Sequence, residues 1–240
     1  GTHYHGWQRQ LTDRTVQGDI ERALCKICNE KITLIGSGRT DAGVHALGQT
    51  ANFRSRSRLG ADDFQRALNS LLGSDIVIRT CEVVAESFHA RFDARSKIYN
   101  YRILNRKVPM AIGHRYAWFI PLDLDLLAMQ SAMVHLKGEH DFKAFEGTGS
   151  PRAHTVRNIY RIGLIEKKEG YLIFDIQANG FLRYMVRNIV GTLVDVGLGK
   201  TGADDVKNIL MSRDRSRAGA TAPPKGLFLM HVCYDQPYEG

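Results

Sequence analysis

The chain has 240 residues, 43% of them hydrophobic, so it can bury a core and is not a disordered segment. Its 33 Lys and Arg residues against 25 Asp and Glu give a formal net charge of +8, which favours nucleic acid or another anionic surface as a partner. Four cysteines are too few for a disulfide framework, which fits the cytoplasm, and no run of about 18 apolar residues could span a membrane.

The first part of the chain predicts two helices and several strands. Val16, Ile20 and Leu24 share one helical face, which predicts an amphipathic helix over residues 15–29. Helical spacing predicts another over residues 61–72. Apolar or alternating runs predict strands at residues 32–35, 46–54, 75–84 and 98–104.

The second part predicts helices at residues 124–136 and 181–196, and a third that starts at Thr201 with Asp204 in the capping-box position. Strands are predicted at residues 155–165, 171–177 and 226–234, the first two joined by a hairpin turn at residues 167–170. Because strands and helices are mixed without regular alternation, we expect an α+β fold with largely antiparallel pairing.

The glycine-rich segment at residues 36–46 is the most informative stretch. Its glycines do not match a dinucleotide fingerprint, and Val44 stands where a phosphate-binding loop needs Lys. What remains is Asp41 beside Arg39, which can keep the carboxylate ionised as a nucleophile or base. The alternative is a structural aspartate that caps a turn, since Asp beside Gly is common there.

Residues 38–46, GRTDAGVHA, resemble the catalytic motif of the tRNA pseudouridine synthase A family. Other segments resemble further family signatures in the same order, and they span nearly the whole chain. They are residues 4–10, residues 88–92 with Tyr99, residues 185–191, and residues 226–227. In the family a β-strand precedes the first of these segments, whereas this sequence begins at that segment.

The resemblance implies the pseudouridine synthase fold: a central, mostly antiparallel mixed sheet flanked by helices, with two similar subdomains around a catalytic cleft. We expect residues 1–105 to carry the aspartate motif and residues 106–240 to complete the sheet and the cleft. The implied substrate is tRNA, at positions 38–40 in the anticodon stem-loop, bound by a homodimer. Uracil leaves its ribose, rotates and reattaches through carbon without redox change, so no cofactor or metal is expected.

The resemblance makes Asp41 the catalytic carboxylate, which adds to the uracil ring, traps the sugar carbon or assists deprotonation at the ribose. Tyr99 corresponds to the family tyrosine that packs against the target base and is a candidate proton acceptor. Arg187 lies in an apolar helix, where a charge needs a partner, and the resemblance implies that this partner is Asp41. We interpret Tyr101, on the same strand face as Tyr99, as a core residue.

The remaining candidates are substrate-binding residues. The resemblance implies that Arg39 fills the space left by the extruded nucleotide. Leu227 lines the pocket beside the base or is an ordinary strand leucine, and His45 contacts phosphate or makes a structural hydrogen bond. Arg54 and Arg91 belong to basic stretches that could contact phosphates or form solvated faces.

Two other hypotheses remain open on the sequence. The chain could modify other RNA uridines, or it could bind or chaperone tRNA without chemistry; the intact Asp41, Tyr99 and Arg187 favour an enzyme. Cys25 and Cys28 have metal-like spacing inside a predicted helix, without a second Cys or His pair nearby. We therefore expect an inert pair and no zinc.

Overall fold

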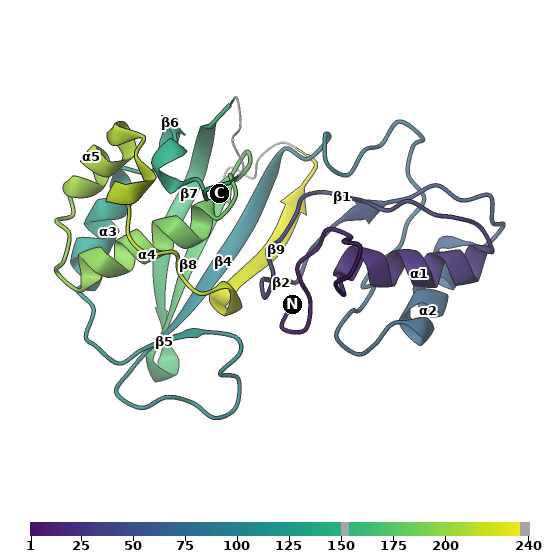
Figure 1. Cartoon of the computed structure of the whole chain (residues 1–240), viewed down its shortest axis with the longest axis horizontal. Helices are drawn as coiled ribbons and strands as arrows, with labels where there is room; N and C mark the ends of the chain where they lie inside the picture. The colour runs from purple at the N-terminus through teal and green to yellow at the C-terminus, as the bar shows by residue number, and fades with distance from the viewer. Residues whose placement is uncertain (150–153, 236–240) are drawn as a thin grey trace. The chain divides into compact units, whose positions relative to one another are not determined.

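The computed structural model describes residues 1–149 and 154–235, and the chain divides into two compact units (Figure 1). Unit 1 comprises Gly1–Val44 and Gln49–Ala94, and unit 2 comprises His45–Gly48 and Arg95–Gly240. The chain thus leaves unit 1 at the end of the glycine-rich segment, contributes a short strand to unit 2 and returns. None of the helices described is long and apolar enough to cross a membrane.

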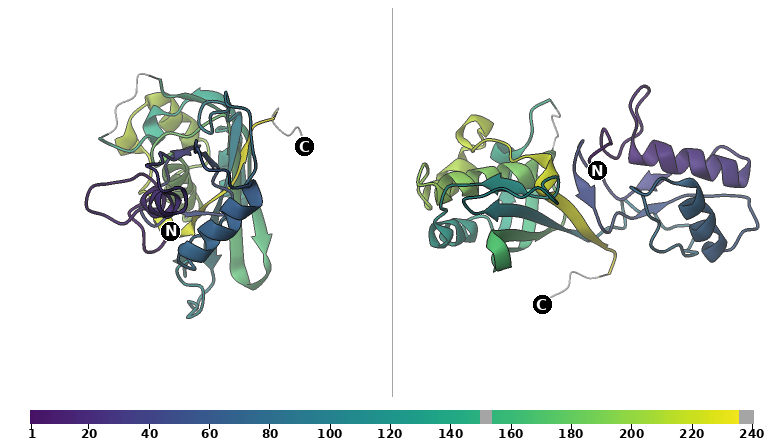
Figure 2. Two further views of the ribbon diagram at one scale, coloured as in Figure 1. Left: turned by 90° about the vertical axis from the view of Figure 1, so that its right-hand side faces the viewer. Right: turned by 90° about the horizontal axis from the view of Figure 1, so that it is seen from below.

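Unit 1 is built around α1 (Val16–Cys28), which matches the helix predicted at residues 15–29. The Thr15 side chain accepts from Gly18 N and caps the first turn, and Asn29 ends the helix in the left-handed conformation. The predicted helix at residues 61–72 is also confirmed as α2 (Ala61–Leu71). The two helices lie side by side (Figure 2). Their apolar faces pack into one hydrophobic core, which consists of Trp7, Ile20, Ala23, Leu24, Ile32, Leu34, Phe64 and Leu68.

The strands of unit 1 are shorter than predicted. β1 (Ile35–Gly36) pairs antiparallel with β3 (Ala51–Asn52), so the strand predicted at residues 32–35 is reduced to its end. The single strand predicted at residues 46–54 is wrong, because β2 (His45–Ala46) pairs instead with a strand of unit 2. The N–H groups of Leu47 and Gly48 both donate to the Leu229 carbonyl, which turns the chain out of that sheet.

The strand predicted at residues 75–84 is also wrong. Side chains of α2 take the hydrogen bonds that a neighbouring strand would otherwise make. Asn69 accepts from Ile78 N at 2.7 Å and donates to Ile78 O at 2.9 Å, and Gln65 donates to Ile78 O at 3.3 Å. The segment is therefore not part of a described β-ladder.

Unit 2 contains a mixed sheet with the order β2-β9-β4-β8-β7-β6, with β5 (Trp118–Ile120) also pairing with β4. The long strands are β4 (Ser96–Asn105), β7 (Val156–Lys167), β8 (Tyr171–Ala178) and β9 (Leu227–Cys233), and β6 (Gly138–Asp141) is shorter. β9 and β8 flank β4 (Figure 1). Only β2–β9 and β4–β5 are parallel among the described pairs, which confirms the predicted α+β class with mainly antiparallel pairing.

The predicted hairpin is confirmed, with β7 and β8 joined by the 3-10 turn Lys168–Gly170. Glu169 and Gly170 have φ values of 64° and 80°, which provide the tight reversal. Along β8, Leu172, Phe174 and Ile176 are buried. Their neighbours alternate to the other face of the sheet and are mostly less buried, so one face carries the core.

The described part of unit 2 also contains α3 (Leu126–Val134), α4 (Met185–Gly197) and α5 (Asp205–Ser212). α3 and α4 pack against each other, and α4 contacts β4. Asp125 caps α3 by accepting from Ala128 N. Short 3-10 segments lie at Lys143–Phe145, Lys168–Gly170, Arg215–Arg217 and Pro224–Gly226.

Two helix starts differ from the prediction. The helix predicted from residue 181 begins only at Met185, because Tyr184 has φ 61° and interrupts the helical backbone. The helix predicted from Thr201 begins at Asp205, and the carboxylate of Asp205, rather than that of Asp204, accepts from Gly202 N. The apolar sequence at residues 181–184 extended the first prediction past the true helix start, whereas the second start was predicted from a capping-box pattern that the structure does not use.

Candidate active site

The glycine-rich segment forms a loop between β1 and β2, and Asp41 begins a turn within it. Val44 N donates to Asp41 O at 3.1 Å, and Gly43, at the third position of this turn, has φ 77°, as in a type II turn. The backbone bond closes the turn, so the Asp41 carboxylate is not needed to close it. Asp41 is half-buried and Arg39 is exposed.

Both sides of this loop are fastened within unit 1. Ser37 N donates to Thr50 O at 2.8 Å, and the Gln49 side-chain amide donates to Gly38 O at 2.9 Å. Trp7 N donates to Thr40 O at 3.1 Å on the other side. After Asp41, Gly43 N donates to Tyr4 O at 3.4 Å, so backbone and amide hydrogen bonds hold the loop on both sides of the aspartate.

The segment at residues 4–10 is the support for the loop. Gly6 has φ 88°, and a Cβ built on it would lie 2.6 Å from Thr40 O, so only glycine allows this approach. Trp7 is buried and packs so closely on Gly36 that a Cβ there would overlap the indole ring. Residues 4–10 and 38–46, which resemble two separate family signatures, thus contact each other in the fold.

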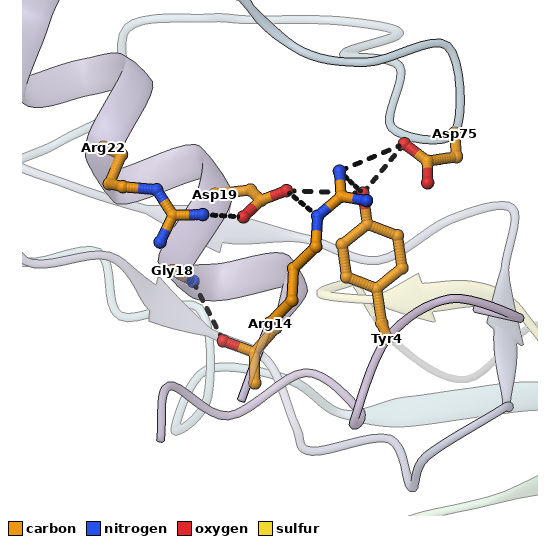
Figure 3. A network of polar contacts seen from close by, with 7 residues as sticks. Tyr4, Arg14, Gly18, Asp19, Arg22 and Asp75 are labelled. Carbon is orange, nitrogen blue, oxygen red and sulfur yellow. Dashed lines mark hydrogen bonds and ion pairs between the residues drawn. The ribbon is translucent and has the colours of Figure 1, made fainter. Parts of the chain in front are cut away.

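A polar network holds the supporting segment against α1 (Figure 3). The Tyr4 hydroxyl donates to Asp75 at 2.8 Å and accepts from Arg14 at 2.9 Å. Arg14 in turn bonds to Asp19 at 2.9 Å, and Arg22 also pairs with Asp19. Burial, together with the Asp75 hydrogen bond, raises the pKa of Tyr4 above its usual value, so the hydroxyl keeps its proton as a donor.

A second set of buried polar groups anchors the strand that enters the loop. Gln17 donates to Leu34 O at 2.9 Å and accepts from Arg9 N at 2.8 Å. Glu21 is 5% exposed and accepts from Leu34 N at 3.0 Å and from Arg9 Nη1 at 2.7 Å. The α1 helix thus fixes both the supporting segment and the chain that leads to Asp41.

In unit 2, Tyr99 lies in the middle of β4, paired with Ile176 on one side and Leu229 on the other. The register of β4 against β9 shifts between Ile98 and Tyr99, so a β-bulge adjoins the tyrosine. Its ring meets Phe181 edge to face at 5.1 Å, and Tyr99 is 9% exposed. The tyrosine therefore lies at the centre of the sheet, on a strand that is paired on both sides.

Tyr101 is a core residue, as interpreted from the sequence. It is fully buried, and its hydroxyl donates to Pro223 O at 2.8 Å. Burial raises the pKa of this hydroxyl above its usual value. Gly226 lies so close to the Tyr101 ring that a Cβ there would approach to 2.7 Å. Leu227 follows, pairs with Tyr101 in the ladder and is buried.

Arg187 is held at the start of α4. Its Nε donates to Ala222 O at 2.7 Å, while Ala222 N donates to Arg187 O at 3.1 Å. The guanidinium also lies 4.8 Å from the centre of the Tyr184 ring. One turn later, Gly191 has no room for a Cβ, which would lie 1.7 Å from Ala220 O. These contacts explain locally why Arg187 and Gly191 stand where they do.

Tyr184 was not singled out in the sequence. It stacks with the guanidinium groups of both Arg183 and Arg187, at 4.6 and 4.8 Å, and Gly147 makes room for its ring. The sequence feature that could have indicated Tyr184 is the pair Arg183-Tyr184 just before the apolar helix. Arg183 precedes α4 and donates to Thr148 O at 3.3 Å and to the Tyr184 hydroxyl at 3.0 Å.

His45 lies on β2 in a packed environment. It stacks on Phe228 at 4.8 Å, meets Tyr116 at 5.0 Å, and its Nε2 is 3.3 Å from Arg115 O. Burial lowers its pKa from the usual 6.5 to about 4, so the ring is neutral near pH 7. These observations favour the structural hydrogen bond over the phosphate contact.

The sequence candidates therefore fall into two groups. Unit 1 carries Asp41 with three exposed arginines, and unit 2 carries Tyr99, Arg187, Leu227 and His45. The exposed arginines are Arg39, Arg54 and Arg91. The pairing of Asp41 with Arg187 stays a prediction, since the two residues belong to different units.

The cysteine pair lies inside α1, where Cys28 accepts from Ser55 Oγ at 3.3 Å. The four cysteines are free and half-buried. Within residues 1–149 and 154–235, no group of three or more His, Cys, Asp and Glu side chains could hold a metal ion.

Comparison with known proteins identifies the class of this fold and motif. Residues 1–93 and 132–235 match the tRNA pseudouridine synthase family. Over 234 residues the chain is 48% identical to tRNA pseudouridine synthase A of Thermoanaerobacter sp. (strain X514), covering 98% of this chain and 96% of that protein. The same protein of Acetivibrio thermocellus is 47% identical with equal coverage, and that of Pseudothermotoga lettingae is 41% identical over 97% and 95%.

A solved structure, "Crystal Structure of a Cbf5-Nop10-Gar1 Complex", is matched over 81% of this chain and 44% of that chain, with 13% identity and a TM-score of 0.36, too low to carry an argument. The α+β sheet with its helices and the sequence matches define a pseudouridine synthase, an isomerase that acts on uridine in RNA. Within this class, the chain belongs to the tRNA pseudouridine synthase family.

Proposed function

We propose that this chain converts uridine to pseudouridine at positions 38–40 of the tRNA anticodon stem-loop, with Asp41 as the catalytic carboxylate. The observation that carries the proposal is the loop around Asp41. Its sequence is the family motif, it is held by hydrogen bonds to Trp7, Gln49 and Tyr4, and the Val44 N–H closes its turn on the Asp41 carbonyl. Such a loop presents a carboxylate in a fixed position, as catalysis requires.

The reaction needs three things of the protein. The uridine must leave its stack, which costs a few kcal/mol. The exposed Arg39, two residues before Asp41, can occupy the space that the uridine leaves. The bond between ribose C1′ and uracil N1 then breaks, the base turns, and a bond forms from C1′ to C5, with the C5 proton transferred to N1 by way of a base. All atoms of the uridine are kept.

Each catalytic candidate has one part in this sequence. Asp41 adds to the ring, traps the sugar carbon or assists deprotonation at the ribose. Tyr99, presented from the centre of β4, packs against the base and is the candidate acceptor of the C5 proton. Arg187 keeps Asp41 ionised, and its own position is fixed by the Ala222 carbonyl. Leu227 contributes an apolar wall beside the base.

The test is to incubate the protein with unmodified tRNA transcripts and to map pseudouridine at every uridine. We expect conversion at positions 38–40 by the wild type and none above background by Asp41→Asn, which keeps the side-chain shape but removes the charge. Conversion at other positions would redirect the substrate assignment. Binding of tRNA without any conversion would leave a non-catalytic binding protein instead.

We also propose a homodimer, in which one subunit grips the tRNA body while the other holds the loop. The support is the sheet face of unit 2 opposite Tyr101, which carries a hollow of about 590 Å³. The hollow is lined by Leu47, Arg102, Gly113, Tyr116, Lys167, Tyr171, Ile173 and Phe228. Leu47 and Tyr116 are 45% and 48% exposed, so burying the hollow against a second subunit would remove apolar surface from water.

Sedimentation equilibrium tests the dimer. We expect the wild type to sediment as a dimer and Ile173→Asp, which places a charge in the hollow, as a monomer. Val134→Asp is the matched control, because Val134 is exposed on α3. A monomeric wild type at micromolar concentration would refute the proposal.

A cytoplasmic location follows from the tRNA substrate and fits the four free cysteines.

A further inference from the structure

Phe92 is an aromatic side chain that unit 1 holds out to solvent. It is 74% exposed, whereas the neighbouring Ala90 is fully buried. An exposed ring leaves an aromatic face open to a ligand, and burying that face on binding is favourable. Phe92 belongs to the family signature at residues 88–92. The proposed chemistry gives the Phe92 ring no role.

The turn that carries Phe92 is fixed by hydrogen bonds at several points. Ala90 N donates to the Asn52 side chain at 2.9 Å, which ties the turn to β3. His89 N donates to the Asp93 carboxylate at 2.8 Å, and Asp93 N donates to His89 O at 3.0 Å. The position of the ring is therefore set before any ligand arrives, which lowers the entropic cost of binding.

The side chains around the ring are those that bind nucleic acid. His89 lies against Phe92, with ring centres 4.2 Å apart and planes 30° apart. Its Nδ1 accepts from the N–H groups of Arg91 and Phe92 at 3.2 Å, so the imidazole is held in place. The Arg91 guanidinium lies 5.5 Å from the Phe92 ring centre and is exposed.

A further cation belongs to the same region. Arg54, two residues after Asn52, donates to Glu86 O at 2.7 Å, and it too is exposed. The Asn52 side chain donates to Phe88 O and accepts from Ala90 N, so β3, two residues before Arg54, is directly joined to the turn that carries Phe92. An aromatic face flanked by arginines is the arrangement with which proteins bind unpaired nucleotides, the ring stacking on a base and the cations contacting phosphates.

We propose that Phe92 is a stacking platform for an unpaired base of the RNA substrate, with Arg91 and Arg54 as its phosphate contacts. The proposal rests on the proposed function and deepens it, because it adds a positioning residue that acts through substrate binding. A protein partner would be served by an apolar ring alone, whereas the adjacent guanidinium groups favour a polyanion with exposed bases.

The test compares two RNA probes, an unmodified anticodon stem-loop and a fully paired duplex of equal length. Loss of one stacked base weakens binding roughly 5- to 140-fold. We expect Phe92→Leu to raise Kd and KM for the stem-loop by a factor in this range, with kcat at saturating RNA retained. Phe92→Trp should bind the stem-loop about as well as the wild type does. In both variants the affinity for the duplex should be unchanged.

Salt dependence separates stacking from charge. Arg91→Ala should lower the slope of log Kd against log salt by about one, whereas Phe92→Leu should leave this slope as in the wild type. Val83→Ala is the matched control, because Val83 is an 89% exposed apolar side chain of the same unit. Thermal unfolding of each variant confirms that the chain is folded.

The outcomes are distinguishable from those for the proposed function. Unchanged stem-loop binding by Phe92→Leu, in a preparation whose wild type forms pseudouridine, refutes stacking alone. Equal weakening on both probes also refutes it. Selective weakening on the stem-loop by Phe92→Leu, with a wild type that forms no pseudouridine in tRNA, supports stacking and refutes the proposed function.

Discussion

Gly6 approaches Thr40 so closely that a Cβ on Gly6 would lie 2.6 Å from the Thr40 carbonyl oxygen. The residue before the catalytic candidate Asp41 is thus in contact with a segment more than thirty positions earlier in the sequence. The geometry of the loop depends on this contact, and it can be tested without altering any candidate catalytic side chain.

Gly6→Ala is expected to displace the Asp41 loop, because the substitution adds both a clash and an unfavourable φ of 88°. We expect a loss of about 1–3 kcal/mol in unfolding free energy and a larger fall in kcat than in tRNA affinity. Gly199→Ala is the control for backbone strain alone, since Gly199 has φ 70° with no atom within 4 Å of the added Cβ. Urea unfolding and single-turnover assays measure both effects. If the two variants lose equal activity, the contact with Thr40 O is not responsible.

A double-mutant cycle tests the predicted pair of Asp41 and Arg187. If the two groups interact, Asp41→Asn and Arg187→Gln should be non-additive in unfolding free energy by roughly 0.5–3 kcal/mol. Arg187→Gln also loses the Nε–H bond to Ala222 O, which the cycle subtracts because it is lost in both arms. If the two effects on unfolding free energy add within about 0.3 kcal/mol, Asp41 and Arg187 do not interact.

Tyr99 and Tyr101 should respond differently to loss of the hydroxyl. Tyr101→Phe leaves the Pro223 carbonyl without its buried donor, so we expect a loss of about 1–3 kcal/mol in stability with kcat retained. Tyr99→Phe should lower kcat, with or without a change in stability, because its hydroxyl is the proposed proton acceptor. Thermal unfolding with kcat measurement on both variants decides the assignment; a retained kcat in Tyr99→Phe would end it.

His45 should make stability depend on pH. Its folded pKa is about 4 and its usual value is 6.5, so between these values the unfolded chain binds a proton that the folded chain does not. Stability is therefore complete above about pH 6.5 and falls as the pH is lowered through this window, by an amount on the order of 2–3 kcal/mol. Urea unfolding at pH 7.5 and 4.5 should show this dependence in the wild type and less of it in His45→Gln.

The same experiment bears on RNA binding. Because His45 is neutral near pH 7, tRNA affinity should not gain a phosphate contact through this residue between pH 7.5 and 6.5. A tRNA affinity that rises over this interval in the wild type and stays level in His45→Gln would instead support the phosphate contact.

Much of the secondary structure followed from local pattern. The first two helices and the β7–β8 hairpin were predicted because their apolar spacing, caps and turn residues lie within a few positions of one another. The strand predicted at residues 75–84 was wrong because that prediction, too, used local pattern alone. Their alternation is that of a strand, but the hydrogen-bond partners of Ile78 are side chains of α2, which no local pattern reveals.

The sequence by itself determined the chemistry: a motif carrying Asp41, a tyrosine strand, an arginine helix and a basic surface, all in the order of one family. Only the tertiary structure decided that Gly6 supports the Asp41 loop, that His45 is buried and neutral, that Tyr184 interrupts the helix before Arg187, and that Phe92 is exposed. The physical reason is that side-chain identity is local, whereas burial, pKa and hydrogen-bond partners depend on segments that are distant along the chain.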